Sequence, residues 1–270
     1  MPAQTIEGVI HALDEIITSA EQDQSRLGYF AALYKAVTKN VKIEVDKGPG
    51  KSVFQDVKRM ERLDVIFANR YLDALQQYQA GNMPSRSWEV AFKGTTYFSP
   101  IVLQHLFVGM NAHIMLDLGI AAAEVVREFD QPLDDLHHDF NEINIILAAL
   151  VHKVETELSS IWPPLRFILK KTPFDLDQTI VNFGMEEARD SAWRFAQELS
   201  PLDGAAFAKR IQEQDQRVAR QGHFLIAPSW WLQGLFFLVR ITEVGSISNQ
   251  IQWLNGKKAM QLVGVGVGGQ

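Results

Sequence analysis

The feature that most constrains this fold is the stretch of residues 99–118, which is apolar on nearly every side yet carries two histidines and an aspartate. Ser99 is a favourable N-cap and Pro100 suits the first helical position, so the pattern predicts a helix that begins there. Gly119 then marks a predicted kink. A helix that is hydrophobic all round is a buried helix. We therefore expect this one to lie at the centre of the molecule.

His113 and Asp117 are the ionisable residues at the middle of this helix. At about 100° per residue, His113 falls on the strongest apolar face, and Asp117 lies one turn on and about 40° round. His105 lies about 80° to the other side. Ionisable groups are costly inside a core, so they need partners, a metal ion or a shifted pKa. This helix is therefore where we expect chemistry.

Two interpretations of the His113–Asp117 pair stay open. Residues four apart share a helix face about 6 Å apart, so the pair can bind one metal ion. The carboxylate can also orient the imidazole as a general base. The structural alternative is a histidine hydrogen-bonded to its own helix neighbour inside a satisfied core. Gly109, one turn before His113, leaves room beside the imidazole and favours the functional interpretation.

Partners for this pair are predicted in a long helix over residues 134–160. Relative to its apolar stripe, Asn144 faces the core and Asp139 lies on the flank. If this helix packs against the central one, either residue supplies a third ligand or an orienting group. The alternative for carboxylates at this helix start is a capping role only.

Arg70 lies on the apolar side of a helix predicted over residues 53–79. A buried arginine needs a carboxylate, either in the protein or on a ligand. Asp73, three residues on, is the structural candidate. His223 is predicted in a turn over residues 222–228, where it can close over a site. A last apolar helix over residues 229–254 begins with Trp230 and Trp231, which either wall an apolar pocket or belong to the core.

Composition narrows the function further. The chain has no cysteine, so a metal site must use His, Asp, Glu or Asn, which favours zinc, iron or manganese. The net charge of −6 and the pI near 5.7 argue against nucleic acid as a partner. The longest apolar run, residues 230–239, is shorter than the ~20 residues of a membrane span. With no signal peptide visible, we expect a cytoplasmic protein.

Nearly every segment has helical periodicity, and no linker divides the chain. We therefore expect an all-α, single-domain bundle of about eight or nine helices around the buried central helix. The domain is predicted to cover residues 1–262, and residues 263–270 form a flexible Gly/Val tail.

Three motifs resemble a bacterial family of unknown function. They are Arg70-Tyr-Leu-Asp-Ala-Leu75, His105-Leu-x-x-Gly-Met-Asn-Ala-His113-Ile-x-x-Asp117-Leu118 and Asp139-Phe-x-x-Ile-Asn144, within residues 53–154. The resemblance implies an all-helical fold but no reaction. It also implies that the polar residues act as a set: Asn111, His113, Asp117, Asp139 and Asn144.

The sequence therefore predicts a helical enzyme with a buried His/Asp polar pocket, either metal-dependent or acid–base, acting on a small and largely apolar substrate. The predicted catalytic residues are His113, Asp117 and Asp139. The predicted substrate contacts are Asn111, Asn144, Arg70, Trp230 and Trp231, and the predicted metal ligands are His113, Asp117, His105 and His223. The rival hypothesis is a non-catalytic helical module that binds an apolar ligand or a protein partner. We expect no transmembrane segment, and a homo-oligomer stays open.

Overall fold

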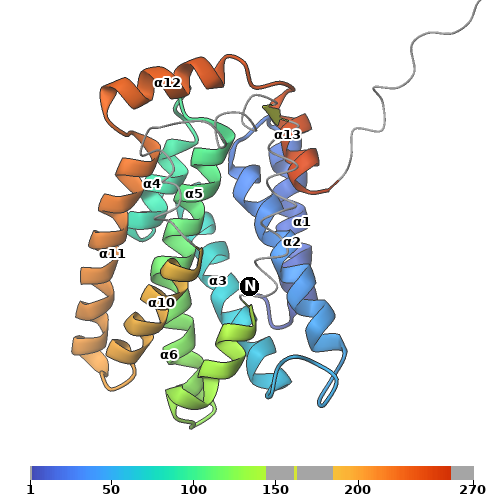
Figure 1. The fold of residues 1–270 in the computed structure, drawn as a ribbon, viewed down its shortest axis with the longest axis vertical. Coiled ribbons are helices and arrows are strands. Elements are labelled where there is room, and N and C mark those ends of the chain that lie inside the picture. Colours follow the sequence, from blue (N-terminus) through green and yellow to red (C-terminus); the bar gives the residue numbers. More distant parts are fainter. Residues whose placement is uncertain (1, 144–160, 163–184, 257–270) are drawn as a thin grey trace, which may run out of the picture.

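The computed structural model describes residues 2–143, 161–162 and 185–256, which form an all-helical bundle (Figure 1). The prediction of an all-α fold is confirmed. The described part holds ten α-helices, slightly more than the eight or nine expected. They are α1 (Ile6–Gln22), α2 (Leu27–Asp46), α3 (Val57–Gln79), α4 (Arg86–Gly94), α5 (Val102–Ala112), α6 (Gly119–Glu128), α10 (Met185–Leu199), α11 (Gly204–Ile226), α12 (Trp230–Arg240) and α13 (Ile247–Leu254).

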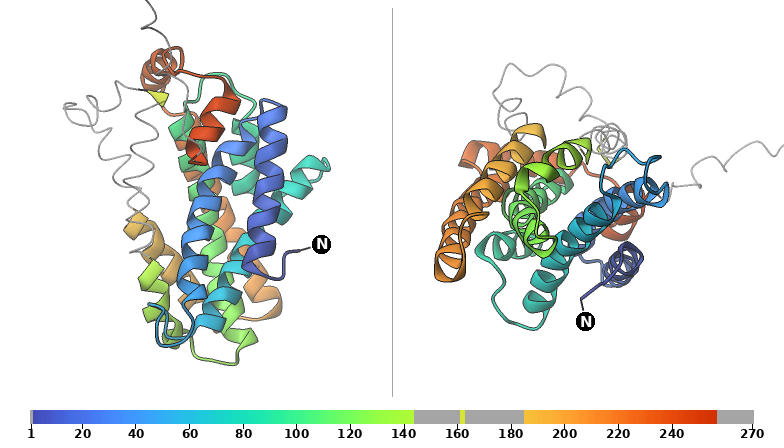
Figure 2. Two further views of the ribbon diagram at one scale, coloured as in Figure 1. Left: turned by 90° about the vertical axis from the view of Figure 1, so that its right-hand side faces the viewer. Right: turned by 90° about the horizontal axis from the view of Figure 1, so that it is seen from below.

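A continuous helix, Val102–Glu128, lies at the centre of the bundle and consists of α5, the π-helix η1 (His113–Leu118) and α6. Helices α2, α4 and α11 pack against α5, while α3 and α10 pack against α6. The view along the bundle in Figure 2 shows the other helices arranged around it. By length and composition this helix is apolar enough to cross a membrane, a test that a buried core helix also passes, and this one is mostly buried.

The central helix begins two residues later than predicted. Ile101, rather than Ser99, is its N-cap. The backbone N–H of Ile101 donates to Oε1 of Gln104 at 3.1 Å, and the N–H of Val102 donates to Oε1 of Glu243 at 2.8 Å. The cap is thus supplied partly by a residue far along the chain, which local sequence signals cannot indicate.

The irregularity in the central helix is a π-helical turn that ends just before Gly119, where a kink was predicted. Gln214 of α11 donates from Nε2 to the carbonyl oxygen of Met115 at 3.0 Å, so this turn is supported from a neighbouring helix. A Cβ at Gly119 would lie 2.8 Å from the carbonyl oxygen of Ala192. Gly119 therefore allows α10 to approach closely rather than bending the helix.

The C-terminal elements also differ from the predictions. His223 lies inside α11, not in a turn. The single predicted last helix is two helices, because α12 ends at Arg240, α13 begins at Ile247 and Gly245 between them has a φ of +86°. Helix α12 lies across one end of the bundle (Figure 1), and α13 packs against α1 and α2.

Candidate active site

His113 and Asp117 lie on the π-helical turn η1, and the structure brings their side chains together. Nδ1 of His113 is 3.2 Å from Oδ2 of Asp117. Only 3% of the first side chain and 2% of the second is exposed. The pair therefore lies in the core of the bundle, as the all-round apolarity of its helix indicated.

Two further helices donate hydrogen bonds to Asp117. Nε of Arg70, on α3, donates to Oδ1 at 3.0 Å, and Nε1 of Trp88, on α4, donates to Oδ2 at 2.8 Å. The predicted partner of Arg70 was Asp73, and this is corrected: Asp73 is exposed and Arg70 pairs with Asp117 instead. Residues three apart share a face only approximately, and here the arginine reaches across to the central helix.

Aromatic rings surround the imidazole of His113. The ring of Phe67 stacks on it with a centroid distance of 3.6 Å and an interplanar angle of 6°. Tyr34 meets it edge-on at 4.5 Å. Three more rings lie at 5.7 to 6.2 Å, those of Phe30, Trp88 and Tyr71. The surroundings of the imidazole are therefore apolar except along its edge toward Asp117.

Gly109 makes this arrangement possible. A Cβ at this position would lie 2.5 Å from Cδ2 of Phe30 and 2.7 Å from its Cγ. The room that Gly109 leaves one turn before His113 is filled by the ring of Phe30.

Three polar atoms, at His113 and around the neighbouring Tyr34, are buried without a hydrogen-bond partner in the described residues. They are Nε2 of His113, the hydroxyl of Tyr34 and Oδ2 of Asp64. Tyr34 lies within electrostatic reach of both Asp64 and Asp117, whose charges add to burial in raising the pKa of its hydroxyl. A buried polar atom without a partner costs about 1–3 kcal/mol, so such a group is a candidate for ligand contact.

Burial also shifts the pKa values of Asp64 and His113. It raises the pKa of the Asp64 carboxyl to about 7, with a smaller contribution from the charge of Glu61. It lowers the pKa of His113 below the ordinary 6.5, although the hydrogen bond to Asp117 and its charge act in the opposite direction. At neutral pH, His113 is therefore uncharged.

The sequence analysis missed Tyr34, Asp64 and Phe67. A signal for Asp64 was present, because an acidic residue between Leu63 and Val65 lies beside the apolar stripe of its helix. No local signal indicated that Tyr34 of α2 would face His113, since that contact depends on how the helices pack.

Asp139 lies elsewhere, at the start of α3. It accepts hydrogen bonds from the backbone N–H groups of Gln55 at 2.6 Å and Asp56 at 3.0 Å, and from Nη2 of Arg59 at 3.2 Å. At 1.5 Å per residue, this helix start is roughly 16 Å from Phe67, the residue that stacks on His113. Asp139 therefore holds the segment just before α3, whose N-cap is Asp56, and does not join the pair, which corrects its predicted role. The other predicted partner, Asn144, lies outside the described residues.

His105 and Asn111 also lie apart from the pair. His105 is eight residues before His113, or about 12 Å along the helix axis. Its ring lies 5.7 Å from that of Tyr29, and burial, followed by the charges of Arg26 and Arg240, lowers its pKa to about 3. Asn111 donates from Nδ2 to the carbonyl oxygen of Val218 at 2.9 Å and so joins α5 to α11.

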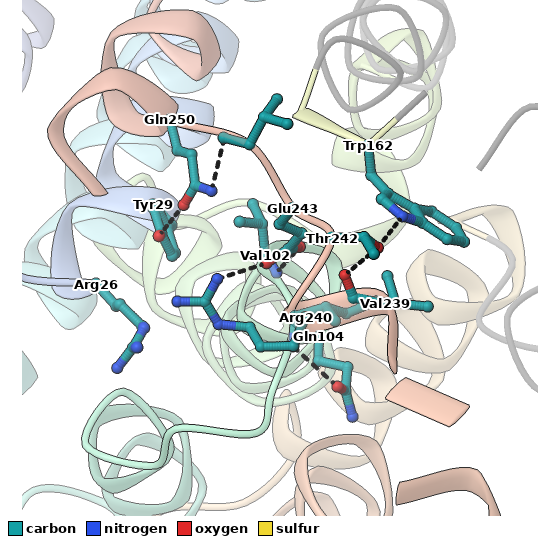
Figure 3. Close-up of polar contacts among 12 residues, drawn as sticks. Arg26, Tyr29, Val102, Gln104, Trp162, Val239, Arg240, Thr242, Glu243 and Gln250 are labelled. Atoms are coloured by element: carbon teal, nitrogen blue, oxygen red, sulfur yellow. Dashed lines mark hydrogen bonds and ion pairs between the residues drawn. The ribbon is translucent and has the colours of Figure 1, made fainter. Parts of the chain in front are cut away.

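A separate polar cluster covers the start of the central helix (Figure 3). Oε2 of Glu243 accepts a hydrogen bond from Arg240 at 3.1 Å, while its other oxygen caps Val102. Gln250 accepts a hydrogen bond from the hydroxyl of Tyr29 and donates one to the carbonyl oxygen of Val244 at 3.1 Å. These contacts fasten the segment between α12 and α13 to the bundle.

The predicted C-terminal members of the site lie at the surface. Trp230 is 85% exposed and Trp231 is 48% exposed, which corrects the expectation that they wall a pocket or belong to the core. His223 is exposed as well. Of the four predicted metal ligands, only His113 and Asp117 lie together, while His105 and His223 lie apart from them. Within the described ranges, no group of three or more His, Cys, Asp or Glu residues is placed to hold a metal ion.

Comparison with known proteins shows to which family the chain belongs. Residues 6–228 match the sequence pattern of a family of unknown function, and this range covers α1 to α11 and the whole His113 site. No curated protein and no solved structure matches the chain.

Proposed function

The chain belongs to the family of unknown function DUF5995, and from that premise we propose that it is a helical acid–base enzyme acting on a small, largely apolar substrate. The observation that carries this proposal is a buried imidazole whose Nδ1 is 3.2 Å from Asp117 and whose Nε2 has no protein partner in the described residues. A carboxylate on one ring nitrogen fixes the tautomer and leaves the other nitrogen for proton transfer.

The protonation state of His113 suits a general base. Its pKa is below the ordinary value, so the ring is neutral at pH 7. With Nδ1–H donating to Asp117, the lone pair is on Nε2, and the carboxylate stabilises the imidazolium that forms when a proton arrives. The charge of Arg70 acts in the opposite direction to that of Asp117 and lowers the pKa of His113.

The surroundings support the substrate class. The rings of Phe67 and Tyr34 favour an apolar body, while the unpartnered hydroxyl of Tyr34 and Oδ2 of Asp64 provide contacts for a polar group. Burial raises the pKa of Asp64 to about 7, so this carboxyl keeps its proton to a higher pH than an exposed one and is suited to donate it. Because His113 is only 3% exposed, substrate entry requires the half-buried ring of Phe67 to move.

A metal-dependent form of this enzyme would use Nε2 of His113 as a ligand for zinc, iron or manganese. The other donors fit poorly. Both oxygens of Asp117 accept hydrogen bonds, from Arg70 and Trp88, and a guanidinium at 3.0 Å opposes a second cation. The proposal is therefore the metal-free form.

The second candidate is a non-catalytic module that binds an apolar ligand or a protein partner. It is favoured by the way in which Arg70, Trp88 and His113 together satisfy Asp117, because such a network also joins α3 and α4 to the central helix. In that case the same residues determine the packing of the core.

Proton transfer can be tested directly. The protein is incubated in D2O with small apolar ketones, esters and lactones, and NMR follows both C–H exchange and hydrolysis. We expect His113→Gln to lower the rate by about 10²–10⁴-fold, the usual contribution of a general base. His105→Gln, at the other buried histidine of the central helix, is the matched control and should retain activity.

Equal rates in wild type and His113→Gln would contradict the acid–base proposal. Nitrogen-15 NMR of His113 gives a second measurement that needs no substrate. A ring that carries its proton on Nε2 at pH 7, with no turnover of any compound, would favour the binding module instead.

A further inference from the structure

Most of the large apolar side chains that the described residues expose lie at one end of the molecule, on α12 and beside it. Trp231 of α12 is one of them, and eight others form the set considered below: Tyr97, Phe98, Phe224, Trp230, Phe237, Leu238, Ile241 and Val244, with exposed fractions from 44% to 85%. We call this set the α12 face. The helix lies across the end of the bundle (Figure 1). Large exposed apolar side chains that gather at one end of a molecule usually mark a site of interaction.

Three exposed residues of α12, together with Ile241 just beyond its end, form one stripe. Trp230, Gly234, Leu238 and Ile241 follow each other at spacings of four, four and three, which places them on one side of a helix. Val239, on the other side, is buried against the bundle. The helix thus packs one apolar side inward and presents a second apolar side outward.

Gly234 is at the middle of this outward stripe, where a helix glycine costs about 1 kcal/mol relative to alanine. The chain itself offers no reason for it, because a Cβ there would meet nothing within 4 Å. By contrast, a Cβ at Gly109 or Gly119 would lie less than 3 Å from a neighbouring helix. A glycine in open space at the centre of an apolar stripe is explained by a backbone that approaches from outside.

The charges favour a protein partner over a lipid surface. The only charged residue of α12, Arg240, is paired with Glu243 at 3.1 Å and 15% exposed. Helices that lie on membranes usually carry a basic polar face, and a net charge of −6 opposes binding to anionic lipid.

The size of the α12 face also fits a dimer. With about 200 Å² for each large side chain and roughly half of it exposed, the eight side chains present on the order of 900 Å². A standard protein interface buries about 800 Å² on each partner. Because the charge of Arg240 on α12 is paired with that of Glu243, the face can meet an identical face without repulsion.

We propose that the α12 face is the interface between two copies of this chain, with the two α12 helices crossing at Gly234 about a two-fold axis. An isologous contact of this kind is the commonest arrangement in soluble oligomers. The proposal is independent of the acid–base chemistry at His113. The α12 helix also lies beyond residues 6–228, the part that the family model matches.

The first test is the mass of the full chain in solution, by light scattering and sedimentation. We expect twice the 30.5 kDa of one chain. The double variant Leu238→Lys, Ile241→Lys should be a monomer with an unchanged circular dichroism spectrum, since lysine is favourable at a helix C-terminus. Ile43→Lys is the matched control, because Ile43 is 58% exposed on α2, and it should remain a dimer.

A second test uses the absence of cysteine from the chain. Gly234→Cys should be joined into a covalent dimer by a short bis-maleimide, whereas Ile43→Cys should not. A wild-type protein that stays monomeric across the micromolar range would overturn the proposal. So would a monomer that floats with neutral phosphatidylcholine vesicles, which would assign the face to a membrane.

Discussion

Arg70 and Asp117 form an ion pair that joins α3 to the central helix, with Nε of the arginine 3.0 Å from Oδ1 of the carboxylate. The arginine side chain is 28% exposed, while Asp117 is 2% exposed. The carboxylate that holds His113 is therefore connected to the surface through one side chain. The other oxygen of Asp117 accepts a hydrogen bond from the indole N–H of Trp88 at 2.8 Å, so both oxygens are fixed in place.

We expect Asp117→Ala to lower the free energy of unfolding by about 2–6 kcal/mol, because two buried donors, the indole N–H of Trp88 and Nδ1 of His113, lose their acceptor at about 1–3 kcal/mol each. Urea denaturation measures the loss. Asp73→Ala is the control: Asp73 is exposed on α3 three residues from Arg70, and its removal should change stability by no more than about 0.5 kcal/mol. Similar losses in the two variants would mean that the pair does not stabilise the core.

Asp64 should make stability depend on pH. Its pKa is about 7 in the folded protein and near 3.8 in the unfolded chain, so the folded state binds more protons between these values. The contribution to stability is complete below about pH 4 and is lost as pH rises through 7, at up to about 1.4 kcal/mol per pH unit. Asp64→Asn should therefore be more stable than wild type at pH 8 and nearly equal at pH 4.

Urea denaturation of both proteins at the two pH values measures this difference. A variant whose stability followed that of wild type at every pH would show that Asp64 titrates normally.

Gly109→Ala should destabilise the protein by about 1–3 kcal/mol, since the added Cβ would lie 2.5 Å from the ring of Phe30 and that ring packs on His113. Thermal unfolding measures the effect. Gly8→Ala is the matched control within a helix, because its Cβ would have ordinary contacts from 3.5 Å outward. That variant should gain about 0.5–1 kcal/mol. If Gly109→Ala were more stable than wild type, as Gly8→Ala should be, Phe30 would not be held against Gly109.

The metal-free form of the proposal predicts that purified protein, after exposure to zinc, iron and manganese followed by desalting, retains much less than one ion per chain by elemental analysis. The physical reason is that Asp117 accepts hydrogen bonds at both oxygens and Arg70 is adjacent. One bound ion per chain in wild type, lost in His113→Ala, would show that His113 is a metal ligand.

Features that depend on residues a few positions apart could be predicted before any tertiary structure was known. Helical periodicity established the all-α class, and the apolarity of residues 99–118 on nearly every side predicted that this helix lies at the centre. The spacing of four brought His113 to Asp117, and Gly109 marked the space beside the ring. Each follows from the geometry of a single helix.

The tertiary structure decided everything that joins one helix to another. It paired Arg70 with Asp117 instead of Asp73, and it placed Asp139 at the start of α3 instead of beside His113. It also brought Tyr34 to the imidazole, and it set Glu243 at the N–H of Val102, 141 positions away. Periodicity shows which face of a helix is buried but not which helix covers it, because that choice depends on packing among all the elements at once.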